Sequence, residues 1–291
     1  CDTPGLEPQG HDPRHDLGHG ADRPCGGGGS SWGARNAGAH IVGAVDAWPV
    51  AVQTYKSNFP SATVINATLD EDTCPSLVKE VGKIDLLLAS PECTNHTCAK
   101  GSRPRDEASR RTANYVVRFA DNLRPRWIVL EIVVQMRNWH GFTPLIGDLQ
   151  GLGYNVESCV LDSADFGVPQ TRRRLFLLCD RVEVPGPVKL TRASSKPPLP
   201  ASKIVQLDGP WSSRPLYSDR RAPDTIARAE RAIDQLGKGV PFLIVYYGSD
   251  GSGGWQPLDR PLRTLTTLDR FGLVTWCRKT PMLRMLQVPE L

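Results

Sequence analysis

The chain has 291 residues, enough to bury a full core in one large domain with a smaller lobe or in two modest domains. Lys and Arg total 35 against 31 Asp and Glu, so the net charge of +4 says less about partners than the local clusters of Arg do. No apolar run approaches a membrane span, and the first thirty residues lack the regions of a secretion signal. We therefore expect a soluble, intracellular protein with no membrane partner.

The eight cysteines are scattered along the chain. Cys159 and Cys179 lie inside apolar runs, where a cysteine behaves as a small hydrophobic residue. A chain of this length without a secretion signal is not expected to form a disulfide framework.

Residues 1–24 carry Pro, Gly, His and Asp with almost no apolar periodicity, which predicts a disordered or atypical tail. His11, His15 and His19 recur at helical spacing, so a metal site is the alternative interpretation. Pro13 and nearby glycines interrupt any helix there, which favours a solvated tail.

From residue 25 the sequence alternates between strand and helix signals, the pattern of a parallel sheet covered on both faces. The predicted helices span 34–38, 49–59, 106–123 and 142–152, and the predicted strands span 40–46, 84–89, 127–133, 154–161 and 174–180. The last two strands read as a closing pair. We predict a Rossmann-like α/β domain over residues 25–184.

After Arg181 the composition shifts to Pro and Ser, and then to glycine-rich turns such as GSDGSGGW. Such a segment is a poor core former. We predict a separate, loop-rich lobe over residues 185–262, followed by a return segment to the first domain over residues 263–291.

The glycine turn CGGGGSSWG begins at Cys25. A run of glycines alone is as often a flexible joint as a ligand cradle. Here Asp46 ends the next predicted strand, where a carboxylate can accept both hydroxyls of an adenosine ribose. Gly26, Gly28 and Gly29 would let the backbone approach such a cofactor.

The predicted strand 84–89 runs into the sequence SPEC, which ends at Cys93. Ligands in open α/β sheets bind outside the carboxyl ends of strands, so Cys93 would face the same crevice as the glycine turn. Nearby arginines would favour its thiolate, the nucleophilic form. Two alternatives stay open: an inert thiol, and a metal site of Cys93, His96 and Cys98, whose spacing is tight for one tetrahedral ion.

Glu131 lies near the end of the predicted strand 127–133, among apolar residues. A carboxylate there is costly unless it has a role or a partner, and a salt bridge to a nearby Arg is the alternative to a catalytic role. Further on, Gln170, Arg172 and Arg174 alternate as they enter a strand, so we expect their side chains to share one face. That row suits phosphate and base contacts.

Basic residues dominate the segment between Cys93 and Glu131. Charge runs are usually solvated helix faces, but this one flanks the candidate nucleophile and could hold a phosphate backbone. Its members are Lys100, Arg103, Arg105, Arg110, Arg111, Arg118, Arg124 and Arg126.

In this order the segments resemble the DNA cytosine-5 methyltransferases, over about residues 22–291. The matching pieces are CGGGGSSWG, Asp46, SPEC, LEIV, ADFGVPQTRRRLF and DRPLRTLT, of which the last two are the most specific. The resemblance implies a Rossmann-like methyltransferase fold in which residues 185–262 form a target-recognition lobe. It also implies a monomer in the bacterial or phage-infected cytoplasm, associated with the nucleoid.

The resemblance further implies S-adenosylmethionine as the cofactor and double-stranded DNA as the partner, with the target cytosine flipped out of the duplex. By position, Cys93 would attack C6 as a thiolate and Glu131 would hold the N3 edge, while Arg172 and Arg174 support the base and the loop. No metal is implied. The implied cofactor residues are Cys25, Gly26, Gly28, Gly29, Asp46, Ala47 and Pro91, and the implied DNA contacts are Gln170, Arg172, Arg103 and Arg105.

The sequence departs from the family pattern at several positions. Glu92 separates Pro91 from Cys93, and a carboxylate there raises the thiol pKa unless an Arg offsets it. Ile132 replaces an Asn, Thr68 stands where an Asp commonly reads the adenine amino group, and Pro24 replaces a bulky apolar residue. We also expect an incomplete domain at both ends, since a Gly-Asn-x-Val-Pro segment is missing after Leu291. A catalytically impaired DNA-binding remnant and an unrelated Rossmann nucleotide-binding enzyme stay open as alternatives.

Overall fold

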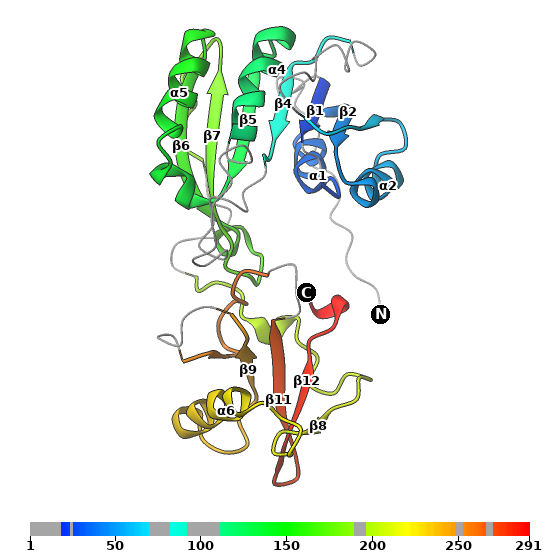
Figure 1. Cartoon of the computed structure of the whole chain (residues 1–291), viewed down its shortest axis with the longest axis vertical. Helices are drawn as coiled ribbons and strands as arrows, with labels where there is room; N and C mark the ends of the chain where they lie inside the picture. The colour runs from blue at the N-terminus through cyan, green and yellow to red at the C-terminus, as the bar shows by residue number, and fades with distance from the viewer. Residues whose placement is uncertain are drawn as a thin grey trace. The chain divides into compact units, whose positions relative to one another are not determined.

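The computed structural model describes residues 19–23, 26–69, 82–91, 111–188, 196–247, 253–265 and 270–291. The chain forms two compact units. The first comprises Cys1–Val160 with Arg174–Pro187, and the second comprises Leu161–Arg173 with Val188–Leu291. Each unit has a sheet of its own (Figure 1).

The first unit contains a seven-stranded sheet with the order β3-β2-β1-β4-β5-β7-β6. Its strands are β1 (His19–Arg23), β2 (His40–Asp46), β3 (Thr63–Asn66), β4 (Leu86–Ala89), β5 (Trp127–Ile132), β6 (Asn155–Asp162) and β7 (Arg173–Asp180). The pairs from β3 through β5 are parallel, whereas β7 runs antiparallel to β5. The predicted Rossmann-like α/β fold is confirmed, including the closing pair β6 and β7.

Helices cover both faces of this sheet, as the alternating strand and helix signals predicted. They are α1 (Gly29–Asn36), α2 (Pro49–Asn58), α4 (Tyr115–Leu123), which follows the short 3-10 helix η4 (Arg111–Asn114), and α5 (Phe142–Gly151). One apolar core joins α4 and α5 to Leu87, Leu130 and Leu177 of the sheet. A second core, on the opposite face, joins α2 to Leu86 and Leu88. β4 is buried on both faces, as a central parallel strand must be.

β1 corrects the predicted boundary of the N-terminal tail. His19–Arg23 pairs with β2 on one side and with β4 on the other, so it lies in the middle of the sheet. The segment HGADR lacks the apolar alternation that marks strands, and its backbone hydrogen bonds to two neighbours make it a strand nevertheless. Residues 1–18, with His11 and His15, lie outside the described residues.

The second unit contains a five-stranded antiparallel sheet with the order β10-β9-β11-β12-β8. Its strands are β8 (Arg214–Pro215), β9 (Phe242–Val245), β10 (Trp255–Pro257), β11 (Phe271–Cys277) and β12 (Thr280–Met285), and α6 (Pro223–Leu236) covers one face. Phe242 and Ile244 pack under α6, whereas Leu243 and Val245 face the opposite core, because successive side chains of a strand alternate. The prediction of a poor core former was wrong here.

The C-terminal residues also differ from the prediction. Residues 263–291 do not return to the first sheet, because β11 and β12 are the third and fourth strands of the second sheet. Residues 161–173, predicted as part of the first domain, belong to the second unit. The Thr171 amide donates to the Leu262 carbonyl at 2.7 Å and the Leu262 amide donates to the Pro169 carbonyl at 2.9 Å, which ties this segment to the second unit.

An enclosed ion pair closes the second unit at its C-terminal end. Arg284 of β12 binds both carboxylate oxygens of Glu290, each at 2.7 Å. The same oxygens accept the amides of Gln206 and Gln287, both at 2.9 Å. Burial raises the pKa of Glu290, but the hydrogen bonds from Arg284 and the two amides outweigh it and hold the pKa below its usual value.

None of the helices in the described ranges is both long enough and apolar enough to cross a membrane.

Candidate functional site

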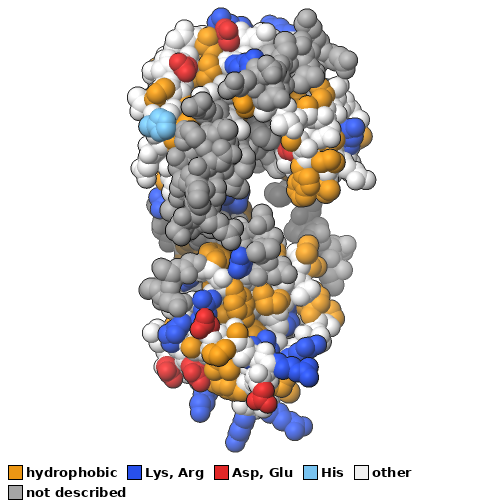
Figure 2. Space-filling model, viewed as in Figure 1, with side chains coloured by type: hydrophobic (Ala, Val, Ile, Leu, Met, Phe, Trp, Pro, Cys, Tyr) orange, Lys and Arg blue, Asp and Glu red, His pale blue; other side chains and the backbone are white. Residues whose placement is uncertain are grey.

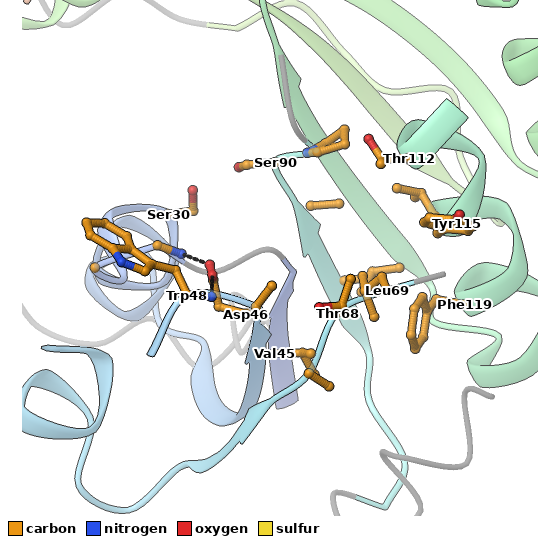
Figure 3. Close-up of a pocket in the computed structure, with 18 of the residues that line it drawn as sticks. Ser30, Val45, Asp46, Trp48, Thr68, Leu69, Ser90, Thr112, Tyr115 and Phe119 are labelled. Carbon is orange, nitrogen blue, oxygen red and sulfur yellow. Dashed lines mark hydrogen bonds between the residues drawn. The ribbon is translucent and has the colours of Figure 1, made fainter. Parts of the chain in front are cut away.

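A cavity of about 590 Å³ opens in the first unit where the glycine turn, β2 and β4 end (Figure 3). Because β1, β2 and β4 run parallel, their carboxyl ends meet at one edge of the sheet. The lining comes from the glycine turn, the end of β2, the residues after β3, the end of β4 and the first turns before and within α4. These residues are Gly26, Gly27, Gly29, Ser30, Val45, Asp46, Ala47, Trp48, Ala67, Thr68, Leu69, Leu87, Ala89, Ser90, Pro91, Thr112, Tyr115, Val116 and Phe119.

Gly28 needs to be a glycine for two reasons. Its φ of +91° lies in the left-handed region, which side chains with a Cβ rarely adopt. A Cβ at this position would also lie 2.7 Å from Phe59 Cε2 and 3.1 Å from a ring carbon of Tyr55. α2 therefore packs directly against the turn and fixes its path, and Gly28 caps α1.

Asp46 is held by the backbone on both sides of its carboxylate. Oδ2 accepts the Gly26 amide and Oδ1 accepts the Trp48 amide, each at 2.8 Å. Each oxygen keeps one lone pair, because a carboxylate oxygen can accept two hydrogen bonds. Figure 3 shows Asp46 and Trp48 on the side of the cavity nearest Ser30. The carboxylate is thus held in a fixed orientation with acceptor capacity left over for further donors.

The sequence did not predict several residues of this site, and two of them have clear roles in it. Asn58, at the end of α2, donates from Nδ2 to the Gly27 carbonyl at 2.8 Å and so holds the turn at a second point. Trp48 lies on the cavity wall with 63% of its surface exposed, although a large apolar side chain is normally buried. An aromatic residue two positions after a strand-ending acid was the signal available in the sequence.

Thr68 and Pro91 both line the cavity, as the resemblance placed them near the cofactor. Ile132, by contrast, is 2% exposed and packs in the core beneath α4 and α5. Its side chain alternates with Glu131 along β5, so it lies on the opposite face of the sheet from the candidate catalytic carboxylate. A polar residue at position 132 would have to be accommodated in that core.

Glu131 forms an ion pair with Arg174, whose Nε lies 2.8 Å from Oε1. The Glu131 side chain is 25% exposed and the Arg174 side chain 16%. β4 and β5 pair with Ala89 opposite Leu130, which brings Ser90 and Glu131 to the same level at the carboxyl edge of the sheet. The salt bridge named as the alternative role of Glu131 is present, and it holds the carboxylate at this edge.

The segment that carries Gln170 and Arg172 is anchored within the second unit. Gln170 bridges to Leu262, and its carbonyl accepts the Ser163 hydroxyl at 2.6 Å. The Arg172 amide donates to Asp162 Oδ1 at 2.9 Å, which leaves its exposed side chain on a fixed backbone. The expected single row is not one strand, because β7 begins only at Arg173.

Several predicted residues lie outside the described residues: Cys25, Cys93, Arg103 and Arg105, together with Glu92, His96 and Cys98 of the alternatives. Among the residues that the structure does describe, no group of three His, Cys, Asp or Glu side chains could hold a metal ion. Burial raises the pKa of Cys179 to about 12, so this thiol stays protonated and is no rival nucleophile.

The sequence and the fold both match known proteins. A family model described as C-5 cytosine-specific DNA methylase matches residues 21–237. The chain is 29% identical over 210 residues to the type II methyltransferase M.AgeI of Thalassovita gelatinovora, covering 68% of this chain and 48% of that protein. It is 27% identical over 238 residues to the mouse (Mus musculus) tRNA (cytosine(38)-C(5))-methyltransferase, covering 80% of this chain and 52% of that protein.

Among solved structures, a Spodoptera frugiperda DNMT2 variant superposes with a TM-score of 0.53 at 23% identity, covering 74% of this chain and 65% of that one. This likeness shows a shared fold. The chain spans about half the length of the curated relatives given above.

Proposed function

The chain belongs to the C-5 cytosine-specific DNA methylase family, and from this we propose that it transfers a methyl group from S-adenosylmethionine to C5 of cytosine in duplex DNA. The observation that carries the proposal is the cavity at the carboxyl edge of the first sheet, with its glycine turn and pre-oriented Asp46, inside the matched residues. The family match supports the reaction class, and the cavity supports the proposal of a cofactor site in the first unit.

The residues present fit S-adenosylmethionine. The turn offers a close backbone approach, since Gly26 and Gly28 have positive φ values of 49° and 91°. The free lone pairs of Asp46 suit two ribose hydroxyls, and the exposed Trp48 ring suits a planar base. When bound, this cofactor supplies an electrophilic methyl group.

Cys93 acts as the nucleophile in this proposal. Its thiolate forms a bond to C6 of a cytosine that has been flipped out of the duplex, because the atom is unreachable within the stack. The addition breaks the C5–C6 double bond and makes C5 electron-rich, so C5 can accept the methyl group. Loss of the C5 proton then restores the double bond and releases the thiolate.

Glu131 holds the N3 and amino edge of the cytosine in this scheme, and Arg174 fixes the Glu131 carboxylate through the 2.8 Å ion pair. Arg172 has an exposed side chain on a segment tied down by Asp162, which suits support of the flipped base or its loop. Gln170, Arg103 and Arg105 are proposed DNA contacts.

Covalent trapping tests the proposal. A duplex that carries 5-fluorocytosine cannot lose a proton from C5, so incubation with S-adenosylmethionine should leave a denaturation-resistant complex of protein and DNA. Cys93→Ala should abolish the complex, and Cys277→Ala, which removes an exposed cysteine of the second unit, should leave it intact. A duplex RNA of the same sequence tests the alternative substrate.

The outcomes separate the proposal from its rivals. A chain that binds the duplex with a steep salt dependence, yet gives no calorimetric signal with S-adenosylmethionine and no adduct, would be a DNA-binding protein without methyl transfer. A thermal shift with a nicotinamide nucleotide in place of S-adenosylmethionine would indicate another Rossmann enzyme. An adduct with RNA but not DNA would overturn the substrate assignment.

A further inference from the structure

The second unit holds three half-buried arginines around Tyr246, which we call the arginine cluster: Arg221, Arg228 and Arg270. Arg221 precedes α6, Arg228 lies within α6, and Arg270 precedes β11. The Tyr246 amide donates to the Arg270 carbonyl at 2.9 Å, which continues the β9–β11 ladder by one residue. By strand alternation Tyr246 and Arg270 share the face that α6 covers.

Each arginine of the cluster is placed by a backbone carbonyl. Arg228 Nη1 donates to the Val245 carbonyl at 2.8 Å, and its guanidinium carbon lies 6.0 Å from the centre of the Tyr246 ring. Arg270 Nη1 donates to the Tyr246 carbonyl at 3.4 Å, and Arg221 Nη2 donates to the Pro215 carbonyl at 3.3 Å. The guanidiniums therefore sit on a fixed frame.

Two of these positive charges lower the pKa of the Tyr246 hydroxyl. Burial raises its pKa, while a hydrogen bond with Thr225 and the positive charges of Arg221 and Arg228 act in the opposite direction. Burial wins and the pKa stays above its usual value, so the hydroxyl keeps its proton at neutral pH. Tyr246 is thus a neutral group beside a positive field.

The charge of the cluster lacks compensation at two of its members. Within the described ranges neither Arg221 nor Arg270 forms an ion pair with a carboxylate, and the Nε of each is buried without a hydrogen-bond partner. Arg284 in the same unit shows the opposite arrangement, with both carboxylate oxygens of Glu290 engaged. Burying part of a guanidinium without a counter-charge costs free energy, which an anionic ligand would offset.

An ordinary solvated surface does not carry this cost. Arg278 and Lys279 lie in the turn between β11 and β12 and are exposed, and Figure 2 shows Lys and Arg side chains projecting from the end of the second unit that carries this turn. Exposed charges such as these stay hydrated. The arginine cluster differs from them because its side chains are half-buried and held by the backbone.

We propose that the arginine cluster binds phosphate oxygens of a nucleic-acid backbone, an inference that rests on the proposed function for its choice of ligand. Guanidinium groups bind phosphate through paired N–H donors, and half-burial leaves part of each group open to such a ligand. Contacts of this kind position a protein on a duplex without reading its sequence. The cluster would therefore contribute to affinity and register, while base selection is made elsewhere.

The salt dependence of DNA binding tests this assignment. Binding of the full chain to a short fluorescent duplex is measured between about 50 and 200 mM salt, and the slope of log K against log[salt] is compared among variants. Arg221→Gln and Arg270→Gln should each flatten the slope by about one unit, and the double variant by about two. Arg221→Lys and Arg270→Lys keep the charge and should keep most of the slope.

Lys238→Gln is the matched control, because Lys238 is exposed and lies just past the other end of the 14-residue helix α6. It removes one charge from the same unit and should leave the slope unchanged. Inorganic phosphate, added in excess of the duplex, tests whether the cluster binds free phosphate or only the phosphates of a nucleic-acid backbone. Competition at constant ionic strength that is lost in the double variant would show that the cluster takes free phosphate as well.

Two results would overturn the inference. If the Gln variants lower the free energy of unfolding but leave the salt slope unchanged, the arginines have a structural role only. A slope that falls equally in Lys238→Gln would show a general charge effect. Covalent trapping is read separately on the same variants, so a chain that shows the predicted slopes but forms no adduct would contradict the proposed function and not this site.

Discussion

Two ion pairs of the same chemical type, one in each unit, differ in how completely the protein encloses them. Glu290 and Arg284 have side chains that are 0% and 6% exposed and form a bidentate pair. Glu131 and Arg174 are 25% and 16% exposed and are joined through Nε at 2.8 Å. Amides of Gln206 and Gln287 complete the hydrogen bonding of Glu290, so no ligand can reach it. The first pair is part of the framework, and the second leaves a carboxylate available at a sheet edge.

The largest expected effect tests the available carboxylate. Glu131→Gln should slow methyl transfer about 10²- to 10⁴-fold, the range that a positioned acid or base contributes, while the free energy of unfolding changes by less than about 1 kcal/mol. Initial rates with labelled S-adenosylmethionine and urea unfolding measure the two quantities. A large loss of stability with an unchanged rate would show that Glu131 is structural, as Glu290 is.

For the enclosed pair of Glu290 and Arg284 we expect a large change in stability instead. Glu290→Gln leaves the buried Arg284 without its counter-charge, so we expect a loss of about 3–5 kcal/mol in the free energy of unfolding. Urea denaturation followed by tryptophan fluorescence is the measurement, and Glu230→Gln on the exposed side of α6 is the control. A loss below about 1 kcal/mol would mean that enclosure does not distinguish the two pairs.

The sequence predicted the first unit better than the second, for physical reasons that individual residues show. β4 is a continuous apolar strand and β5 is apolar apart from Glu131, and such runs can be recognised from the sequence alone. β1 is not, because its place between β2 and β4 depends on backbone pairing with segments far along the chain. In the second sheet β9 and β10 are short and a glycine-rich segment of sequence lies between them, so its core becomes visible only when β9 and β11 are paired.

Some residues of the candidate site could be predicted from the sequence and others could not. Asp46 ends a clear strand, so its place beside the glycine turn followed from the parallel order of strands. Asn58 was missed because its contact with the Gly27 carbonyl depends on how α2 docks against the turn. The ion pair of Glu131 could be named as an alternative, but its partner Arg174 required the antiparallel register of β5 and β7.

A smaller effect on stability is expected from substitutions in the glycine turn, which is an uncharged part of the site. Gly28→Ala forces a Cβ to within 2.7 Å of Phe59 in a left-handed conformation, and we expect a loss of about 2–3 kcal/mol together with weaker binding of S-adenosylmethionine. Gly26→Ala has a positive φ but no atom within 4 Å of the added Cβ, so it should cost only about 1 kcal/mol. Calorimetry and thermal unfolding compare the two. Equal losses would show that the clash with α2 is relieved without cost.

The smallest expected effect concerns pH and compares Glu290 with Asp180, a buried carboxylate of the first unit. Burial raises the pKa of Asp180, but hydrogen bonds from the Val182 amide, Arg126 and Trp127 outweigh it and leave the pKa below its usual value of 3.8. A carboxyl with a depressed pKa in the folded state stabilises the fold fully above its unfolded pKa, and this contribution is lost as pH falls through the folded value. Because burial and hydrogen bonding oppose each other in both residues, each contribution should be modest. We expect acid unfolding of both units to begin below about pH 4.5, the usual value for Glu, and Glu290→Gln to remove part of that pH dependence in the second unit only. If the acid transition is unchanged in Glu290→Gln, other carboxylates cause the acid sensitivity. The pair of Glu290 and Arg284 would then differ from that of Glu131 and Arg174 in its burial and not in its response to pH.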